Sequence, residues 1–195
     1  MVSKKIAVTG AQYSGKTTLI KNISTALKKR GYSVCILGEV VRDCPFPINE
    51  TTSVKAQDWV LEEQKRREDE LKDKCDVILT DRCLLDNFAY WKRAAERIGL
   101  GEKEIRLGET EVFNHANSYS AILFLQPFEV KRIESDKFRS IDKEWREEMH
   151  KRILDVIKKF SKKSKVPVFY IRGDERKMFE QAMKRVFAIL IPPSK

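Results

Sequence analysis

The chain has 195 residues, of which 42% are hydrophobic and 35% are charged, a balance typical of a folded globular protein and not of a disordered one. This length favours a single domain over residues 1–195, with a core that needs neither disulfides nor a structural metal. No apolar run approaches the roughly 20 residues of a membrane span, and the N-terminus lacks the features of a signal peptide. We therefore expect a cytoplasmic protein without a membrane partner.

The net charge is +10, from 39 Lys and Arg against 29 Asp and Glu. Such an excess favours an anionic partner, such as nucleic acid, a membrane surface or phosphate groups. The charge is uneven, because no acid precedes Glu39 and a second basic excess lies between Lys131 and Lys165. Two interpretations follow: a nucleic-acid surface, or the lining of a phosphate site.

Apolar runs alternate with segments of helical periodicity, the pattern of an α/β protein. The expected strands are residues 5–9, 33–37, 76–80, 121–125 and 166–171. The expected helices cover residues 17–30, 54–72 and 84–98, a short stretch near Val112, a long segment around 145–160, and 179–189. Five apolar strands separated by helices predict a parallel sheet covered on both faces. In such sheets, ligands bind at the carboxyl ends of the strands.

A phosphate-binding motif lies between the first strand and the first helix. Residues 10–17 match G-x-x-x-x-G-K-[ST], the P-loop. Its backbone N–H groups and the following helix N-terminus form an anion nest. Lys16 should reach the β and γ phosphates, and the Thr17 hydroxyl should bind Mg²⁺. The residues expected to hold ATP, with GTP as an alternative, are Gly10, Ala11, Gln12, Tyr13, Ser14, Gly15, Lys16, Thr17 and Thr18.

Charged residues follow two further strands. Asp81 ends the third strand, where it can hold Mg²⁺, and Arg82 beside it can bind a second anion. Glu39 ends the second strand, where a carboxylate can accept the proton of an attacking hydroxyl. Arg42 follows it and is assigned to the acceptor pocket. The alternatives are a helix-capping role for Asp81 and a solvated loop position for Glu39.

Two further sets of residues are candidates for binding the acceptor and the transferred group. Gln57, Trp59 and Gln64 could read and stack a flat base; alternatively, Trp59 packs on the sheet and Gln57 is exposed. Residues 128–145 correspond to a lid, whose arginine would neutralise the transferred phosphoryl group. Arg139 is the preferred lid residue, with Arg132 and Arg146 after it. Acids interleave with these cations, so a charged surface helix is the alternative.

The cysteines and histidines suggest no metal site. Cys35, Cys44, Cys75 and Cys83 show no C-x-x-C spacing and are interpreted as free thiols of a reducing cytosol. The only histidines, His115 and His150, have no partners at metal-ligand spacing. Each is interpreted as a surface or helix-packing residue, so zinc is not expected.

The order of these motifs carries a resemblance over nearly the whole chain. Its pieces are Val8-Thr9-Gly10 into the P-loop, Glu39-Val40-Val41-Arg42, Gln57, Gln64-Lys65-Arg66-Arg67-Glu68, Val77-Ile78-Leu79-Thr80-Asp81-Arg82, Asp86 and Tyr90, and Phe138-Arg139-Ser140-Ile141-Asp142. With these, the chain resembles the P-loop kinase superfamily. Within it, the chain resembles the AAA-domain-like ATPase/kinase family of nicotinamide riboside kinases, itself similar to deoxynucleoside and thymidylate kinases.

The resemblance implies a three-layer α/β/α P-loop NTPase fold with strand order 2-3-1-4-5. It also implies Mg-ATP-dependent phosphorylation of a nucleoside-like hydroxyl, with Glu39 or Asp81 near the acceptor and with Arg82 and Asp86 among the acceptor-side residues. Deoxynucleoside kinases resemble each other in a Glu-Arg-Ser element, whereas this chain has Asp81-Arg82-Cys83. The class of acceptor therefore stays open.

Other functions of P-loop proteins compete with this interpretation. The chain has neither the N/T-K-x-D nor the D-x-x-G motif of a regulatory GTPase, and it lacks an LSGGQ-like signature. A polynucleotide 5′-kinase remains the second choice because of the net charge. An NTP-binding protein without transfer activity is the third. The sequence leaves the oligomeric state open.

Overall fold

The computed structural model describes residues 2–48, 50–126 and 142–191. A five-stranded parallel sheet has the order β2-β3-β1-β4-β5, which confirms the predicted fold class. The strands are β1 (Lys4–Gly10), β2 (Val34–Leu37), β3 (Val77–Asp81), β4 (Ala121–Leu125) and β5 (Val168–Ile171). The helices are α1 (Lys16–Lys28), η1 (Val40–Asp43, a 3-10 turn), α2 (Val54–Glu70), α3 (Leu84–Arg97), α4 (Glu102–Ala116), α5 (Lys143–Lys163) and α6 (Glu175–Leu190).

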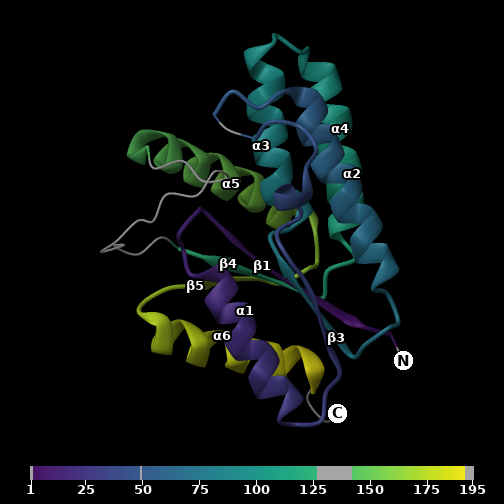
Figure 1. The fold of residues 1–195 in the computed structure, drawn as a ribbon, viewed down its shortest axis with the longest axis vertical. Helices are drawn as coiled ribbons and strands as arrows, with labels where there is room; N and C mark the ends of the chain where they lie inside the picture. The colour runs from purple at the N-terminus through teal and green to yellow at the C-terminus, as the bar shows by residue number, and fades with distance from the viewer. Residues whose placement is uncertain (1, 49, 127–141, 192–195) are drawn as a thin grey trace.

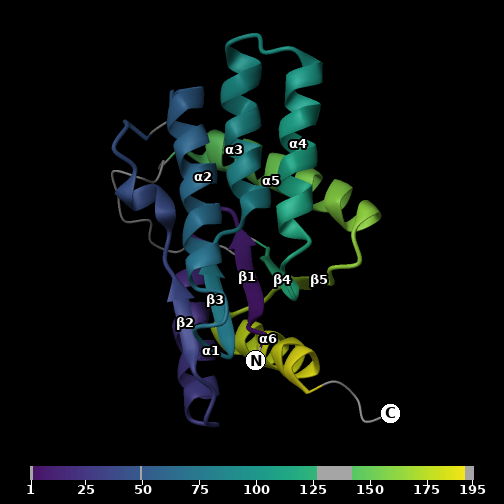
Figure 2. The same ribbon diagram turned by 90° about the vertical axis from the view of Figure 1, so that its right-hand side faces the viewer.

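The helices cover both faces of the sheet (Figure 1). Helices α1 and α6 pack on one face, and α2, α3, α4 and α5 lie on the other, with α2, α3 and α4 side by side in Figure 2. Side chains of β1 alternate between the two faces of the sheet. Ile6 and Val8 pack with α1 and α6, whereas Ala7 packs in the core formed with α2, α3, α4 and α5. No helix in the described ranges is long and apolar enough to cross a membrane.

The register of the central strands assembles the carboxyl edge of the sheet. Val8 of β1 pairs with Asp81 of β3, and Gly10 pairs with Leu125 of β4. A Cβ on Gly10 would lie 2.5 Å from the carbonyl oxygen of Leu125, and the φ of Gly10 is +137°. Gly10 is therefore required for close packing against β4 as well as for the turn of the loop.

Helix α4 is longer than the short stretch near Val112 that its glycines suggest, since it contains 15 residues. Gly101 precedes it and Gly108 lies inside it, where glycine costs about 1 kcal/mol relative to alanine. A Cβ on Gly108 would lie 3.4 Å from the Trp91 ring and 3.5 Å from the Phe88 ring of α3. Gly108 thus lets α4 approach α3 closely, and tertiary packing offsets its low helix propensity.

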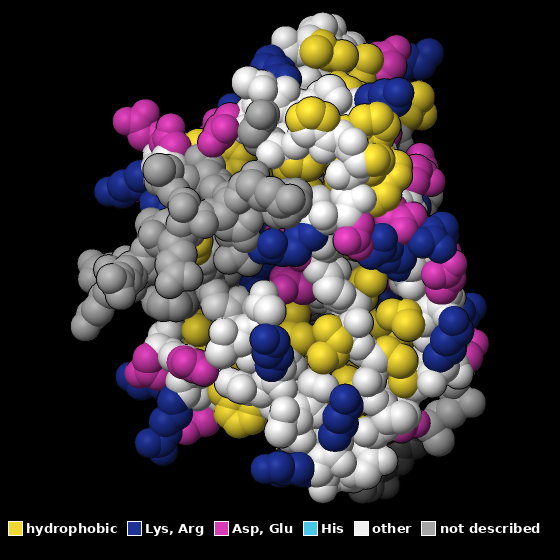
Figure 3. Space-filling model, in the orientation of Figure 1, with side chains coloured by type: hydrophobic (Ala, Val, Ile, Leu, Met, Phe, Trp, Pro, Cys, Tyr) yellow, Lys and Arg dark blue, Asp and Glu magenta, His cyan; other side chains and the backbone are white. Residues whose placement is uncertain are grey.

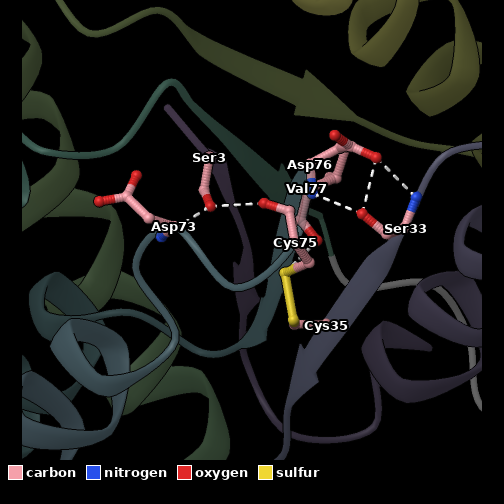
Figure 4. The surroundings of a disulfide bond; sticks show 7 residues. All are labelled: Ser3, Ser33, Cys35, Asp73, Cys75, Asp76 and Val77. Carbon is pink, nitrogen blue, oxygen red and sulfur yellow. Dashed lines mark hydrogen bonds between the residues drawn. A yellow bond between two sulfur atoms is a disulfide. The ribbon is translucent and has the colours of Figure 1, made fainter. Parts of the chain in front are cut away.

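The prediction of free thiols is wrong for two of the four cysteines. Cys35 of β2 and Cys75, which precedes β3, form a disulfide with a Cα–Cα distance of 6.0 Å (Figure 4). They are 40 positions apart in the sequence, so local spacing gives no signal. Pairing of β2 with β3 brings them together, and Ser33 donates both its N–H and its hydroxyl to Asp76 beside them, at 2.7 and 2.6 Å. Cys44 and Cys83 are free, as predicted.

Candidate functional site

The loop between β1 and α1 ends at Gly15, whose φ of +83° is tolerated without a Cβ and which caps the first turn of α1. The buried Lys16 folds back over this loop, and its Nζ donates to the carbonyl oxygens of Gly10 at 3.2 Å and Ala11 at 2.8 Å. The Ser14 hydroxyl is buried and has no hydrogen-bond partner in the described part of the chain. The loop therefore offers an ammonium group, a spare hydroxyl and a helix N-terminus to an anion.

The pKa of Lys16 is lowered to about 8. Burial is the largest cause, followed by the like charge of Arg82, whereas Asp81, Glu39 and Asp86 oppose the shift. A buried ammonium beside a second cation is destabilised until an anion joins it. The electrostatics of the loop therefore favour a bound anion.

Thr17 and Asp81, the two predicted metal ligands, lie side by side. The Thr17 hydroxyl donates to Oδ2 of Asp81 at 2.6 Å, across the gap between α1 and β3. The other carboxylate oxygen, Oδ1, is buried and lacks a hydrogen-bond partner among the described residues. No group of three or more His, Cys, Asp and Glu that could hold a metal occurs in the described ranges. Two oxygen donors fit Mg²⁺, which takes one or two protein ligands and completes its shell with phosphates and water.

Arg82 lies directly after β3 in an unusual backbone conformation, with a φ of +82°. The Arg82 N–H donates to the carbonyl of Val8 at 3.0 Å, and the Thr80 hydroxyl donates to the Arg82 carbonyl at 2.7 Å. These two bonds fix the strained turn and direct the side chain toward Glu39, the residue two positions beyond β2.

The guanidinium of Arg82 is held by two carboxylates. Its Nε donates to Oε1 of Glu39 at 2.7 Å and its Nη1 to Oδ2 of Asp86 at 3.3 Å, and all three side chains are at most 6% exposed. Burial opposes the charge of Arg82, but Tyr90, Glu39 and Asp86 outweigh it and hold its pKa above the usual value. Burial raises the pKa of Asp86, against the effect of Arg82. The cluster is a preorganised cation with flanking acids, next to the Lys16 loop.

The other predicted residues divide into those near this cluster and those away from it. Arg42 in η1 donates from Nε to Oε2 of Glu39 at 3.2 Å, so it belongs to the cluster. Thr18 is exposed in the first turn of α1. In α2, Gln57 is buried and Trp59 half-buried, whereas Gln64 donates to Glu68 at 2.8 Å, toward the amino ends of the strands. The lid candidates Arg139 and Arg132 lie outside the described residues.

Two aromatic residues for which the sequence predicts no site role also line the cluster. The guanidinium carbon of Arg82 lies 5.4 Å from the Tyr90 ring, and the Trp145 ring of α5 packs 5.8 Å from Tyr90 at an angle of 44°. The Tyr90 hydroxyl and the Trp145 Nε1 are buried and unpartnered within the described part of the chain. A signal existed for Tyr90, because Asp86 and Tyr90 are four residues apart on α3 and so share one face of that helix. No spacing pointed to Trp145.

A glycine-bounded loop leads from a central strand into a helix that begins with a lysine, and an acid ends the neighbouring strand; together these define the class of P-loop NTPase folds. The sequence profile of the AAA domain family matches residues 5–174. The chain therefore belongs to the AAA domain family. No curated protein matches the sequence.

Solved structures of kinases and of a NadR protein share the fold. "NadR protein in complex with NAD and AMP-PNP" has a TM-score of 0.71 and 15% identity over 99% of this chain and 51% of the NadR chain. Deoxyadenosine kinase from M. mycoides with bound dCTP has a TM-score of 0.64 and 20% identity over 94% and 99% of the two chains. Thymidylate kinase from Ehrlichia chaffeensis has a TM-score of 0.62 and 15% identity over 94% and 98%. This chain thus spans about half the length of the NadR protein and nearly all of the two kinases.

Proposed function

We propose that the protein is a P-loop kinase that transfers the γ-phosphoryl group of ATP to a hydroxyl of a small nucleoside-like or nucleotide acceptor. The observation that carries the proposal is Arg82, which is clamped between Glu39 and Asp86 and is near enough to the buried Lys16 for its charge to lower the pKa of that lysine. A protein that only bound or hydrolysed a nucleoside triphosphate would have little use for this second buried cation cluster. A kinase would use it to position the acceptor beside the transferred group.

On the nucleotide side, the loop from Gly10 to Gly15 would hold the phosphates by its N–H groups, with Lys16 neutralising the β and γ phosphates. Thr17 and Asp81 would hold Mg²⁺, which supplies charge neutralisation between the β and γ oxygens when it is bound. GTP remains an alternative donor, because no described contact selects a base.

On the acceptor side, Arg82 would orient the acceptor and Glu39 would accept the proton of its hydroxyl. The transition state of phosphoryl transfer is loose, so positioning and charge matter more than early proton removal. A carboxylate held by Arg82 and Arg42 is suited to orienting a hydroxyl. Asp81 next to Arg82 is the alternative acid near the acceptor, and Gln57, Trp59 and Asp86 remain candidates for its pocket.

The ligands of similar proteins suggest which acceptors to test. The structures with this fold include NadR bound to NAD and AMP-PNP or to NR, deoxyadenosine kinase with dCTP or dATP, and a thymidylate kinase. We therefore choose nicotinamide riboside, nucleosides, nucleoside monophosphates and oligonucleotides with a 5′-hydroxyl as acceptors, with [γ-³²P]ATP as donor.

One labelled small-molecule product is the expected result. Lys16→Ala should lower its formation about a thousandfold, or about 4 kcal/mol, because the ammonium is lost from the phosphates. The matched control is Lys21→Ala, which removes an exposed lysine from the same helix and should leave the rate with small acceptors unchanged. Labelled phosphate without product on any acceptor would favour an NTPase, and full activity of Lys16→Ala would refute the assignment of the site.

A polynucleotide 5′-kinase is the second candidate, and the surface of α1 is the observation that favours it. Lys21, Lys28 and Lys29 are exposed and make no ion pair within the part of the chain that the structure describes. Figure 3 shows Lys and Arg side chains over the face that α1 presents. Labelling of oligonucleotides, with binding that falls steeply as salt rises, would support this function. Labelling of small acceptors alone would exclude it.

A further inference from the structure

The first turn of α5 contacts both sides of the candidate site. Arg146 places its guanidinium carbon 5.6 Å from the centre of the Tyr13 ring in the P-loop. Its neighbour Trp145 packs against Tyr90, which in turn lies over Arg82 on the acceptor side. One helical turn therefore reaches the nucleotide loop with a cation and the acceptor cluster with a ring.

Both partners of the Tyr13–Arg146 contact are restrained, Tyr13 by its backbone conformation and Arg146 by a bond to the start of α5. Tyr13 has a φ of +61°, in the left-handed region that residues with a Cβ seldom adopt. Arg146 donates from Nε to the Asp142 carbonyl at 3.2 Å, and the Asp142 side chain caps α5 by accepting from the N–H of Trp145 at 3.2 Å. An unfavourable conformation at Tyr13 that points its ring at a restrained arginine suggests a function for the ring.

We propose that Tyr13 is a positioning residue that holds Arg146 over the phosphate nest, where its guanidinium contacts the γ-phosphate of a bound nucleoside triphosphate. This inference rests on the proposed nucleotide site and adds to it the residue that distinguishes a triphosphate from a diphosphate. Lys16 is buried and bonds to the loop carbonyls of Gly10 and Ala11. Arg146, in contrast, is half-buried and reaches Tyr13 of the same loop from α5, so it would approach the γ-phosphate as a second cation beside Lys16. Arginine suits both contacts, because its planar guanidinium stacks on an aromatic face while its N–H groups bind phosphate oxygens.

The chain offers variants that separate the ring from the rest of the loop. Tyr13→Phe keeps an aromatic face under Arg146, Tyr13→Ala removes it, and Arg146→Ala removes the cation. We would measure the dissociation constants of Mg-AMP-PNP and Mg-ADP by calorimetry for each variant and for the double variant Tyr13→Ala/Arg146→Ala. No acceptor is needed, so the result does not depend on identifying one.

Arg146→Ala should weaken Mg-AMP-PNP binding about tenfold or more and leave Mg-ADP binding unchanged, because a charge-assisted contact to the γ-phosphate is lost. Tyr13→Ala should weaken Mg-AMP-PNP binding roughly three- to tenfold, the range of a lost cation–π contact. Tyr13→Phe should match the wild type. The double variant should bind Mg-AMP-PNP no more weakly than Arg146→Ala alone, because the ring acts only through Arg146.

Equal losses for both nucleotides in Tyr13→Ala would overturn the inference, since they would mean a deformed loop. Additive losses in the double variant would overturn it as well, because the two residues would then act independently. If the wild type binds Mg-AMP-PNP and these ratios hold while no acceptor is labelled, the proposed kinase activity fails and this inference stands. If the wild type binds neither nucleotide, the inference fails with the nucleotide site.

Discussion

Two buried clusters of charged side chains lie at opposite ends of the sheet. At the carboxyl ends, Arg82 binds Glu39 and Asp86. At the amino ends, Glu68 of α2 is fully buried and pairs with Lys5 of β1 at 2.7 Å. Both clusters place a cation and acids in a low-dielectric interior, where unpaired charges are costly.

The clusters differ in how completely the chain satisfies them. The Glu68 carboxylate accepts from Tyr119 at 2.6 Å and Gln64 at 2.8 Å, and the His115 ring lies 3.2 Å from it. Burial opposes its ionisation, but His115, Lys5 and Tyr119 hold the pKa of Glu68 below its usual value. The Glu68 carboxylate is thus satisfied, and Oε1 of Gln64 is the buried polar atom beside it that lacks a partner among the described residues, whereas around Arg82 buried polar atoms of Asp81, Tyr90 and Trp145 all lack one. We call the Glu68 cluster the closed cluster and the Arg82 cluster the open cluster. A cluster whose charges are satisfied stabilises the fold, whereas one with several unpartnered polar atoms is suited to binding a ligand.

The largest effect on stability should come from the closed cluster. Glu68→Gln keeps the shape of the side chain but leaves the Lys5 ammonium buried without a counter-charge. We expect the free energy of unfolding in urea to fall by about 3–5 kcal/mol. Transfer per folded molecule should stay at the wild-type rate, because the cluster is at the far end of β1 from the P-loop.

The matched control for this change is Glu70→Gln on the same helix, where an exposed acid pairs with Arg66. It should cost less than about 1 kcal/mol. A folded Glu68→Gln protein that binds Mg-AMP-PNP but has lost transfer would contradict the comparison, because the closed cluster would then serve the reaction.

Removing an acid from the open cluster should lower the rate of transfer strongly and the free energy of unfolding only a little. Glu39→Gln should lower kcat about a hundredfold, equivalent to about 2.7 kcal/mol, because an amide cannot accept the proton of the acceptor hydroxyl. Unfolding should change less, since Arg82 keeps Asp86 as a partner. Steady-state kinetics with the labelled acceptor measures the first effect, and urea unfolding the second. Asp43→Asn, an exposed acid in η1, should leave both unchanged, and wild-type kcat in Glu39→Gln would exclude that residue as the base.

The two clusters also differ in how far the sequence predicts them. Glu39 lies two positions beyond one apolar strand and Asp81 ends another, and parallel strands bring such positions to one edge, so the open cluster can be predicted from strand ends and a motif. The closed cluster joins Lys5, Glu68, His115 and Tyr119 without any common spacing. The sequence suggested only that His115 packs on a helix or lies at the surface. Contacts between distant segments depend on the packing of α2 and α4, which periodicity cannot give.

The same limit explains the other differences. The alternation of strands and helices follows from apolar periodicity, and the strand order is implied by the resemblance to P-loop kinases; both predictions are confirmed. The Cys35–Cys75 disulfide arises from the β2–β3 register, and the length of α4 from the contact of Gly108 with α3. Each is set by a neighbour that is remote in sequence. The base-reading assignment of Gln57, Trp59 and Gln64 stays a prediction, with Gln64 bound to Glu68 in the closed cluster.

The smallest predicted effect is the pH dependence of nucleotide binding at Lys16, beside the open cluster. The pKa of Lys16, lowered to about 8 chiefly by burial and by Arg82, means that the free protein loses this charge as pH rises through 8. A bound diphosphate requires the charged form of Lys16. Above about pH 8, binding must therefore include the protonation of this lysine. Affinity for Mg-ADP should therefore fall as pH rises, by about tenfold or 1.4 kcal/mol between about pH 7 and 9.

Calorimetry of Mg-ADP binding across this range measures the effect, and Lys16→Arg is the control. A guanidinium keeps its charge at these pH values, so that variant, though weaker, should show a flat profile. A flat profile in the wild type would mean that Lys16 stays charged in the free protein, with Asp81, Glu39 and Asp86 outweighing burial and Arg82. The open cluster would then balance its own charges as the Glu68 cluster does, and a bound anion would not be needed to stabilise Lys16.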